Sequence, residues 1–550
     1  MPLVTATIKS DEIVMNPNFE LLSIDISKEF NKIPVAELKL IEGDIARNEF
    51  TILDGGFFAP GKQVEIALKY QDDSAEEEVV FVGVVVHQGL ELNRTGTTLL
   101  VEMNDAAVKM TAVRNNALFA DKKDSAIIQE LVQQNGLTAG IIAGTPLAHA
   151  QMVQYYASDW DFCISRAEAN GHLLIADDGK ISTQEPKIGA PVLQLELGRD
   201  HIFDFDLQVN GRDQLGAVES VAWDIAKQAL TKPHQGEEFK LAQGDHNLDQ
   251  ITKVVGGEKA TLVHPVALHP TELKSWADAQ VVKSRLSLVR GTLQIPGTVK
   301  VKVGQTIEIK GVSERFTGKN IVSGVRHQIT ATGWVTSLQL GMDANWFSAR
   351  TRVVDTQAAG LLPGVNGLQI GRVVAQEKDP NHEFRLKVDI PAFDRQKGAV
   401  WARLTSLDAG AERGVFFRPE VGDEVVVGFL NDDPRQAIVL GSLHSSANPP
   451  PVTPTPENGV KGLFTRKQYQ LQFDEENETI TLSTSAKNRI AIDEKVGCIS
   501  IQDAHGNVVE MGPDGLLLDC AQDCTIKTKG DFSLDAKGNV KIAGKKVDLI

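Results

Sequence analysis

The chain contains 550 residues, of which 42% are hydrophobic and 23% are charged, and its formal net charge at pH 7 is −17. Nucleic acids and anionic lipid surfaces repel such an acidic chain, so we expect no nucleic-acid partner and no electrostatic attachment to membranes. No stretch approaches the run of about eighteen apolar residues that a membrane-spanning helix needs. The N-terminal residues lack the basic and apolar regions of a Sec-type signal peptide, so we expect none.

The first part of the chain, up to residue 345, reads mainly as β-strands. Apolar and polar residues alternate in runs such as 63–70, 98–104 and 335–342. This period of two is typical of strands with one buried face. Many short strands with few helices favour β-barrels that carry helical inserts.

Two helices are predicted to interrupt these strands. The first begins with Ser125 as its N-cap and stops at Gly136. The second begins with Ser158 as its N-cap and stops at Gly171. Both have the hydroxyl residue at the start and the glycine at the end that helix termini favour.

The middle of the chain predicts a small barrel followed by a linker. Residues 365–446 contain five strand-like runs, the number that an OB-fold barrel needs. Residues 447–459 are rich in proline, which indicates a stiff, extended linker. From residue 460 onward the sequence indicates only strands and turns.

The C-terminal sequence repeats with a period of eight residues. Each repeat contains two apolar or small residues that are separated by one other residue. Burying two side chains contributes roughly 3–6 kcal/mol, whereas fixing eight backbone units costs roughly 8–16 kcal/mol. Hydrogen bonds between chains must supply the difference. We therefore predict that residues 460–550 of three identical chains intertwine as a β-helical needle, with an exposed β-meander as the alternative. The predicted needle-core residues are Leu516, Leu518, Cys524, Ile526, Phe532, Leu534, Val540 and Ile542.

The repeat changes phase at the last residues. Val547 and Leu549 come one residue early. Together with Ile550, they are expected to leave a small apolar triangle at the blunt end of the needle.

No motif predicts a catalytic, cofactor-binding or metal site. Residues 56–63 have P-loop spacing, but Gln63 stands where the Mg²⁺-binding hydroxyl belongs and opens a strand instead of a helix. His264 and His269 are each followed by proline and have no metal-binding partner at a suitable spacing, so they read as loop residues. A pair of catalytic carboxylates among the 73 Asp and Glu residues stays open.

The four cysteines, Cys163, Cys498, Cys520 and Cys524, are too few to form a disulfide framework in a chain of this size. Cys520 and Cys524 lie in a segment predicted to be extended, where their Cα atoms would be roughly 13 Å apart. That separation is too large for a disulfide bond. We therefore expect both to be small buried apolar residues.

Three parts of the chain carry a resemblance to a known family. They are the predicted second helix with its preceding strand (154–171), the strand pair at 297–329, and the runs 385–391 and 417–443. These segments resemble the VgrG and phage baseplate hub–spike family, although Ala157 stands where that family usually has Glu. The resemblance covers essentially the whole chain. It implies a mainly β protein with a hub of two related β-barrel subdomains and small helical inserts at 1–355, followed by the OB fold at 365–446 and the intertwined needle.

The resemblance also implies a function. Three chains would form a structural spike that adapts the inner tube of a contractile injection machine to a membrane-puncturing needle, without catalysis or cofactors. The implied partners are inner tube proteins at the hub, other baseplate proteins, and a PAAR-like tip protein that contacts Val547, Leu549 and Ile550. The spike would assemble in the bacterial cytoplasm and belong to a contractile particle that is released from the cell, and it would meet membranes only during puncture.

Two alternative functions stay open at this point. The first is an envelope hydrolase that acts on peptidoglycan and carries a needle. The second is a trimeric adhesin or tail fibre, which would share a β-helical shaft. Some relatives carry a lysozyme domain before the needle or a toxic enzyme after it, and neither is present in these 550 residues. This difference favours the mechanical spike.

Overall fold

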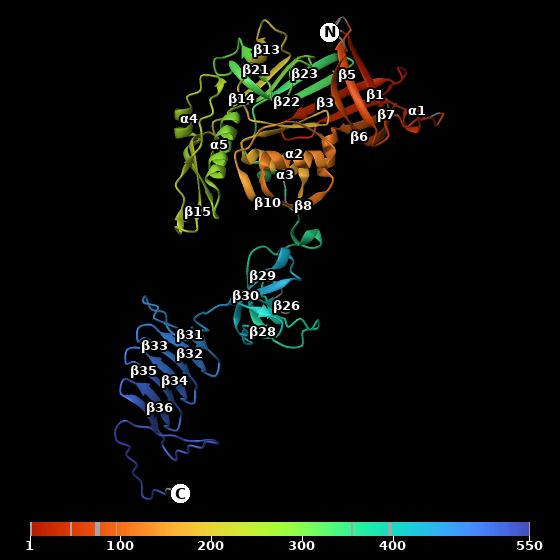
Figure 1. The fold of residues 1–550 in the computed structure, drawn as a ribbon. Helices are drawn as coiled ribbons and strands as arrows, with labels where there is room; N and C mark the ends of the chain where they lie inside the picture. The colour runs from red at the N-terminus through yellow and green to blue at the C-terminus, as the bar shows by residue number, and fades with distance from the viewer. Residues whose placement is uncertain are drawn as a thin grey trace. The chain divides into compact units, whose positions relative to one another are not determined.

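The computed structural model describes residues 3–44, 47–71, 77–94, 96–351, 353, 356–393 and 399–548. The chain divides into two compact units, residues 1–356 and 357–550, each of which is described by itself (Figure 1). Strands dominate the regular structure of both units, which confirms the prediction of a mainly β protein.

The first unit is organised around one continuous 14-stranded sheet. Its halves carry separate cores, one around Phe58 and Phe81 and the other around Leu293 and Leu338. The two halves join where β3 pairs with β22 in antiparallel register, so the two predicted barrel subdomains are the two ends of one sheet. The N-terminal half contains β1 (Val4–Ser10), β2 (Ile13–Val14), β3 (Leu21–Glu29), β4 (Val35–Ile41), β5 (Gln63–Tyr70), β6 (Glu78–Asn93) and β7 (Gly96–Asn104). The other half contains β13 (Pro191–Glu196), β14 (Asp204–Val209), β18 (Ala242–Gln243), β20 (Val289–Pro296), β21 (Thr306–Lys310), β22 (Gly318–Thr330) and β23 (Gly333–Leu340).

A helical insert packs below this sheet and contains both predicted helices. Ser158 caps the second helix by accepting a hydrogen bond from the Asp161 amide, as predicted. The N-cap prediction for the first helix is wrong by two residues, because the helix starts at Asp124 after Lys123. Asp124 turns inward to an ion pair with Arg166, which favours the earlier start. The insert contains β8 (Arg114–Lys123), α2 (Asp124–Gln134), β9 (Thr138–Ile142), β10 (Ala148–Ser158), α3 (Asp159–Ala169), β11 (Leu173–Asp177) and β12 (Lys180–Gln184).

A second insert contains two helices that the sequence analysis missed. The longer one, α5 (Pro270–Leu286), begins with proline in its first turn and buries Leu273 and Ala277, and Ala277 packs in a cluster with Val218 of β15. The other members of this insert are β15 (Leu215–Asp224), β16 (Ala229–Leu230), β17 (His234–Gln235), α4 (Leu248–Val254) and β19 (Gly257–His264). The unit also has the single turns η1 (Ala106–Thr111), α1 (Thr51–Asp54) and α6 (Phe347–Arg350).

The second unit begins with a closed five-stranded barrel in the order β24-β25-β26-β30-β29. Val388, Val427 and Val439 belong to its fully buried core. All five predicted strands are present, which confirms the OB-type barrel. The elements are η2 (Gln357–Gly360), β24 (Gln369–Ala375), β25 (Leu386–Asp389), β26 (Ala399–Leu404), β27 (Ala409–Gly410), β28 (Arg413–Gly414), β29 (Glu424–Phe429), η3 (Leu430–Asp432) and β30 (Ala437–Ser442).

The C-terminal part contains a sheet and a segment without strands. The sheet is an antiparallel meander of seven five-residue strands, each paired with the next one in the chain. Residues 460–519 therefore pair within one chain, whereas we expected intertwining from residue 460 onward. Described residues 520–548 contain no strand. The strands are β31 (Val460–Phe464), β32 (Gln470–Asp474), β33 (Thr479–Ser483), β34 (Arg489–Asp493), β35 (Cys498–Gln502), β36 (Val508–Gly512) and β37 (Gly515–Asp519).

Candidate functional site

One face of the C-terminal sheet carries two continuous rows of apolar side chains, which we call the apolar face. Residues directly opposite each other in an antiparallel pair lie on the same face, and the register places Ile480 opposite both Phe473 and Ile492. Both rows continue across the later strand pairs, and in the first pair only the second row does, because Phe473 lies opposite Lys461. The first row is Phe473, Ile480, Ile492, Ile499, Met511 and Leu516, and the second row is Leu463, Leu471, Leu482, Ile490, Ile501, Val509 and Leu518.

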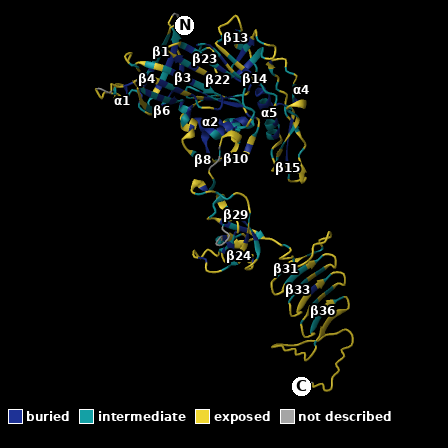
Figure 2. Ribbon diagram, turned by 180° about the vertical axis from the view of Figure 1, so that it is seen from behind, coloured by how far each residue is buried: buried dark blue, intermediate teal, exposed yellow. Residues whose placement is uncertain are grey.

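The apolar face is uncovered within the single chain. Ile492 is 41% exposed and Leu516 is 66% exposed, and Figure 2 shows the strands of this sheet in the colours of intermediate and exposed residues. A contiguous apolar surface on a folded sheet marks an interaction surface. Covering side chains that are about half exposed contributes on the order of 1 kcal/mol for each. The two rows are therefore an incomplete hydrophobic core, which a partner must cover.

The opposite face of the sheet is mainly polar in its middle strands, although Leu517 of β37 also lies on it. Arg489 donates a hydrogen bond to Thr481 Oγ1 at 3.3 Å. Ala491 lies opposite Thr481 on one neighbouring strand and opposite Ser500 on the other, and it is buried. The sheet is thus amphipathic, and both continuous apolar rows lie on the apolar face.

Asparagine side chains link the turns of this sheet. Asn488 Oδ1 accepts a hydrogen bond from the Ala504 amide, and Asn507 Oδ1 accepts one from the Ala521 amide, each at 3.0 Å. Within the second turn, the Asn507 side chain donates to Asp503 at 2.7 Å, and this hydrogen bond lowers the pKa of Asp503. These contacts fix the turn conformations and the strand register, so the rows stay aligned.

The described residues 520–548, which we call the repeat segment, expose their predicted core residues. Among described residues 520–548, the structure shows no backbone–backbone hydrogen bond, and every residue from Ala521 to Asp548 is exposed. Buried backbone amides and carbonyls need partners, so this segment can bury its apolar residues only by pairing with other chains. The exposed apolar side chains are Ile526, Phe532, Leu534, Val540, Ile542 and Val547.

The structure divides the predicted needle core between the two segments. Leu516 and Leu518 lie in β37, at the end of the two rows, and the other predicted residues lie beyond it. The prediction missed the earlier members of the rows. A signal was present in the sequence, because the runs QLQFD, TITLS, RIAID and CISIQ each place apolar residues at the second and fourth positions.

The predicted tip contact is only partly described by the structure. Val547 is 51% exposed. Leu549 and Ile550 lie outside the described residues.

The cysteines differ from the prediction in one respect. The chain bends at Ala521 and Gln522, and Cys520 forms a hydrogen bond with Cys524 that raises the pKa of Cys520. The expected 13 Å separation of an extended segment is therefore wrong. Cys524 is exposed within one chain, so its burial in the three-chain needle core stays a prediction. Cys163 is fully buried in α3, and burial raises the pKa of its thiol.

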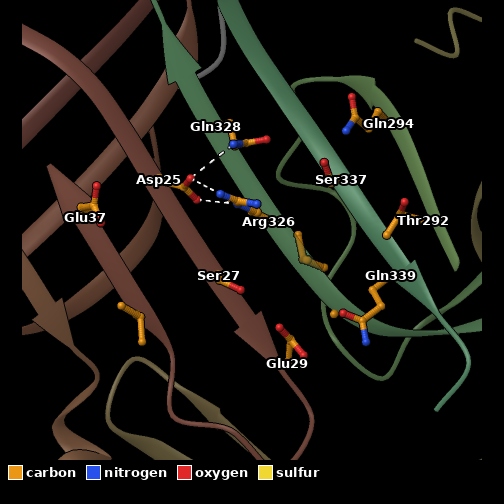
Figure 3. A pocket seen from close by; sticks show the side chains of 13 residues that line it. Asp25, Ser27, Glu29, Glu37, Thr292, Gln294, Arg326, Gln328, Ser337 and Gln339 are labelled. Atoms are coloured by element: carbon orange, nitrogen blue, oxygen red, sulfur yellow. Dashed lines mark hydrogen bonds and ion pairs between the residues drawn. The ribbon is translucent and has the colours of Figure 1, made fainter. Parts of the chain in front are cut away.

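A polar groove of about 510 Å³ lies where β3 and β22 join the halves of the large sheet (Figure 3). Asp25 accepts two hydrogen bonds from Arg326 and one from Gln328. The other acids that line the groove, Glu29 and Glu37, are paired with basic residues as well. Their partners are Lys32 at 2.6 Å and Lys39 at 3.4 Å. The groove therefore presents paired charges, amides and hydroxyls.

The buried ionic groups of the first unit join its elements. Lys283 Nζ of α5 lies 2.7 Å from Glu168 of α3, and Glu168 also accepts the Phe347 amide at 2.8 Å. Burial alone would raise the pKa of Asp124, but two hydrogen bonds from Arg166 lower it. Each of these charges has a structural partner.

Neither a metal cluster nor a membrane helix is found in the described part of the chain. No three or more His, Cys, Asp or Glu residues there are grouped so that they could hold a metal ion. His269 instead caps α5 by accepting a hydrogen bond from the Thr271 amide. None of the helices described here combines the length and apolar character required to cross a bilayer.

Two family models match the chain. Residues 1–331 match the model described as the Alg8 N-terminal domain, which is more than half of the chain. The chain belongs to the Alg8 N-terminal domain family. Residues 369–444 match the Type VI secretion system/phage-baseplate injector OB domain, and this range contains all five strands of the barrel.

Curated VgrG proteins are similar to part of this Alg8-family chain. The actin cross-linking toxin VgrG1 of Vibrio cholerae is 33% identical over 116 residues, which are 20% of this chain and 10% of that protein. The type VI secretion system spike protein VgrG3 of the same species is 32% identical over 118 residues, which are 20% of this chain and 11% of that protein. The matched region thus spans about a tenth of these relatives. Together with the OB-domain match, they confirm the predicted resemblance to the VgrG and phage baseplate hub–spike family.

Solved structures include similar tail proteins. The 43 kDa tail protein of prophage MuSo2 from Shewanella oneidensis has a TM-score of 0.46 and 10% sequence identity, covering 62% of this chain and 99% of that chain.

Proposed function

We propose that three copies of this chain form the central spike of a contractile injection machine. Residues 1–356 are the hub that adapts the inner tube to the spike, and residues 460–550 form the needle. The observation that carries this proposal is the uncovered apolar face, which runs across all seven strands of the C-terminal sheet and is followed by a repeat segment without backbone partners. The relatives described as spike proteins support the same function.

The dimensions of the apolar face support a threefold arrangement. The two rows are two residues apart along each strand, which is about 7 Å at 3.4 Å per residue. Three such narrow faces can enclose one axis as a triangular prism. Each sheet then buries its rows against the other two, and its polar face, with Arg489 and Thr481, remains in water.

In this arrangement the needle gains stiffness from strand pairing within each chain over residues 460–519 and from interchain hydrogen bonds over the repeats that follow, which leave few free sheet edges. The sheath of the machine supplies the work, and the spike transmits it to the target envelope. Exposed charges of both signs keep the needle in solution without attraction to lipid. In the repeat segment they include Lys527, Asp531, Asp535, Lys537, Lys541, Lys545 and Lys546.

The proposed partners follow from the same model. Inner tube proteins contact the hub, and baseplate proteins surround it. Val547, Leu549 and Ile550 bind a PAAR-like tip protein, a proposal supported by the exposure of Val547. The chain assembles in the bacterial cytoplasm and becomes part of a particle released from the cell. The envelope hydrolase gains no support, since the acids that line the groove in Figure 3 are paired with basic residues.

The mass of the full chain in solution tests the proposal. Native mass spectrometry and light scattering at micromolar concentration are expected to give three times the chain mass, and electron microscopy is expected to show a thin needle with threefold symmetry. A monomer at that concentration would contradict the proposal. Release of muropeptides by the purified trimer, abolished by one carboxylate substitution, would replace it with the hydrolase.

A further inference from the structure

The OB barrel carries an apolar patch on its outer surface, which we call the dish. In β29 and β30, Val425, Val427 and Val439 point into the barrel core, so the alternate residues point outward. These outward residues are apolar too. Strands that are apolar on both faces are typical of strands buried on both faces, yet only the inner face is covered by this barrel. The dish consists of Leu368, Ile370, Val426, Gly428, Ile438 and Leu440.

The floor of the dish is Gly428. A Cβ atom placed there would lie 3.4 Å from Leu368 Cδ2, and 3.7 Å from both Ile438 Cγ2 and Leu440 Cδ1. Gly428 is itself buried, so these aliphatic side chains close over it and form the surface of the dish. Leu368 is 63% exposed and Ile370 is 52% exposed, so this surface is open to a partner.

The same barrel presents aromatic and aliphatic side chains on the loop between β26 and β29, which we call the knob loop (residues 405–418). Phe416 is 83% exposed and Leu407 is 95% exposed. Phe384, at the start of β25, is 85% exposed. Side chains of this size are costly to leave in water, and their number on one small barrel indicates a surface for another protein.

The knob loop is held in place by hydrogen bonds from side chains and from the backbone. Ser406 Oγ donates to the Val415 carbonyl at 2.7 Å, and the Val415 amide donates to the Asp408 carbonyl at 2.9 Å. Arg418 donates to the Phe384 carbonyl at 3.0 Å, which ties the loop to the neighbouring segment. The exposed rings are therefore fixed in position before any partner binds, which lowers the entropy cost of binding.

We propose that Phe416 of one copy packs on the dish of the next copy, so that three OB barrels close into a ring. This inference rests on the proposed three-copy spike and names a contact within it. The dish lies on β24, β29 and β30, whereas the knob loop follows β26, so one surface cannot serve as both halves of the contact. Head-to-tail contacts between two different surfaces generate rings, whereas a twofold contact needs a self-complementary surface.

The linker to the needle favours this contact. β30 ends at Ser442 and β31 begins at Val460, so each barrel is tied by residues 443–459 to a sheet that the proposed trimer holds at its axis. Such tethering raises the effective concentration of one barrel at the next. Even a weak contact between Phe416 and the dish then suffices to close the ring.

Cysteine cross-linking in the full chain tests the contact. Cys498, Cys520 and Cys524 are first replaced by Ser, and the buried Cys163 is kept. Phe416→Cys and Leu440→Cys, the latter at an exposed position of the dish, are then combined in one chain and oxidised with copper phenanthroline. We expect a covalent trimer on non-reducing gels that returns to the monomer band on reduction. Either single variant should stay monomeric on the gel, and so should the control that pairs Phe416→Cys with Lys387→Cys on β25, a strand outside the dish.

Native mass spectrometry of the same samples separates the possible failures. A trimeric mass without interchain disulfides, or with a disulfide inside one chain, would overturn the contact and leave the proposed spike intact. A monomeric mass would overturn both. As a second measurement, Phe416→Asp in the natural chain should keep the trimeric mass and raise hydroxyl-radical labelling of Leu440 severalfold. Unchanged labelling would count against the contact.

Discussion

Ile480 and Ile492 lie directly opposite each other across the β33–β34 pair, and each leaves 41% of its surface exposed. The two side chains contact each other along the row, but no residue of the same chain covers them from above. The free energy gained by covering them therefore belongs to the assembly and not to the folded monomer.

Ile492→Asp is expected to abolish the trimer, because three carboxylates would be buried without partners around one axis, at a cost of several kcal/mol. Ser500→Asp is the matched control, since Ser500 lies on the polar face of the neighbouring strand. Light scattering should give a monomeric mass for the first variant and a trimeric mass for the second. A trimeric Ile492→Asp variant would show that the apolar face is not the interface.

Lys283→Ala is expected to destabilise the hub by about 3–5 kcal/mol, because it leaves the buried Glu168 carboxylate without its cation. Lys274→Ala, in the same helix, removes a more exposed ion pair with Asp278 and should cost less than about 1 kcal/mol. Urea unfolding of both variants measures the difference. Equal midpoints would mean that the buried pair contributes no more than the more exposed one.

His327 should make the hub sensitive to acid. Burial, aided by the charge of Lys28, lowers the pKa of His327 to about 4, and Trp334 Nε1 donates to its Nδ1 at 3.4 Å. The unfolded chain, with a histidine pKa of about 6.5, binds the proton first, so this contribution to stability is complete above pH 6.5 and is lost as the pH falls towards 4. Between pH 6.5 and 5 the loss is about 2 kcal/mol, at about 1.4 kcal/mol per pH unit.

His327→Gln should lack that part of the pH dependence. Urea unfolding at pH 6.5 and at pH 5 gives the difference for the natural chain and for the variant. An equally large drop in the variant would assign the acid sensitivity to other groups.

Removal of residues 547–550 is expected to abolish binding of the tip protein and to leave the trimer intact. The apolar contact offered by Val547, Leu549 and Ile550 disappears, whereas the two rows and the remaining repeats are unchanged. Co-purification of the tip protein with the truncated and complete spikes provides the measurement. Undiminished recruitment would place the tip contact elsewhere.

The OB barrel could be predicted because its five strands are set by local alternation and their closure follows from their number. The helix α5 was missed although its signal was present: Pro270 stands in the first turn, and Leu273, Ala277 and Val281 recur every four residues. The start of α2 could not be placed from Ser125, because the inward ion pair between Asp124 and Arg166 joins residues that are distant in sequence.

The C-terminal part shows a second limit of sequence reasoning. A period of two indicates a strand with one buried face, but it does not say which chain supplies the neighbouring strand. The rows from Leu463 to Leu518 and the repeats after them have the same local pattern. The first segment pairs within the chain, and in the second the structure shows no such pairing. The dish was missed for a related reason, since burial on the outer side of a barrel depends on another molecule.

The change from the seven-stranded meander to the eight-residue repeats also determines how three chains can align. A sequence that repeats every eight residues still matches its neighbours after a slip of eight residues. Phe532 and Leu534 then take the places of Cys524 and Ile526. The strands of the meander are unevenly spaced and linked by Asn488 and Asn507, so a slipped alignment there loses its contacts. In the proposed trimer, the meander therefore sets the alignment of the three chains, and the repeats follow from its last strand.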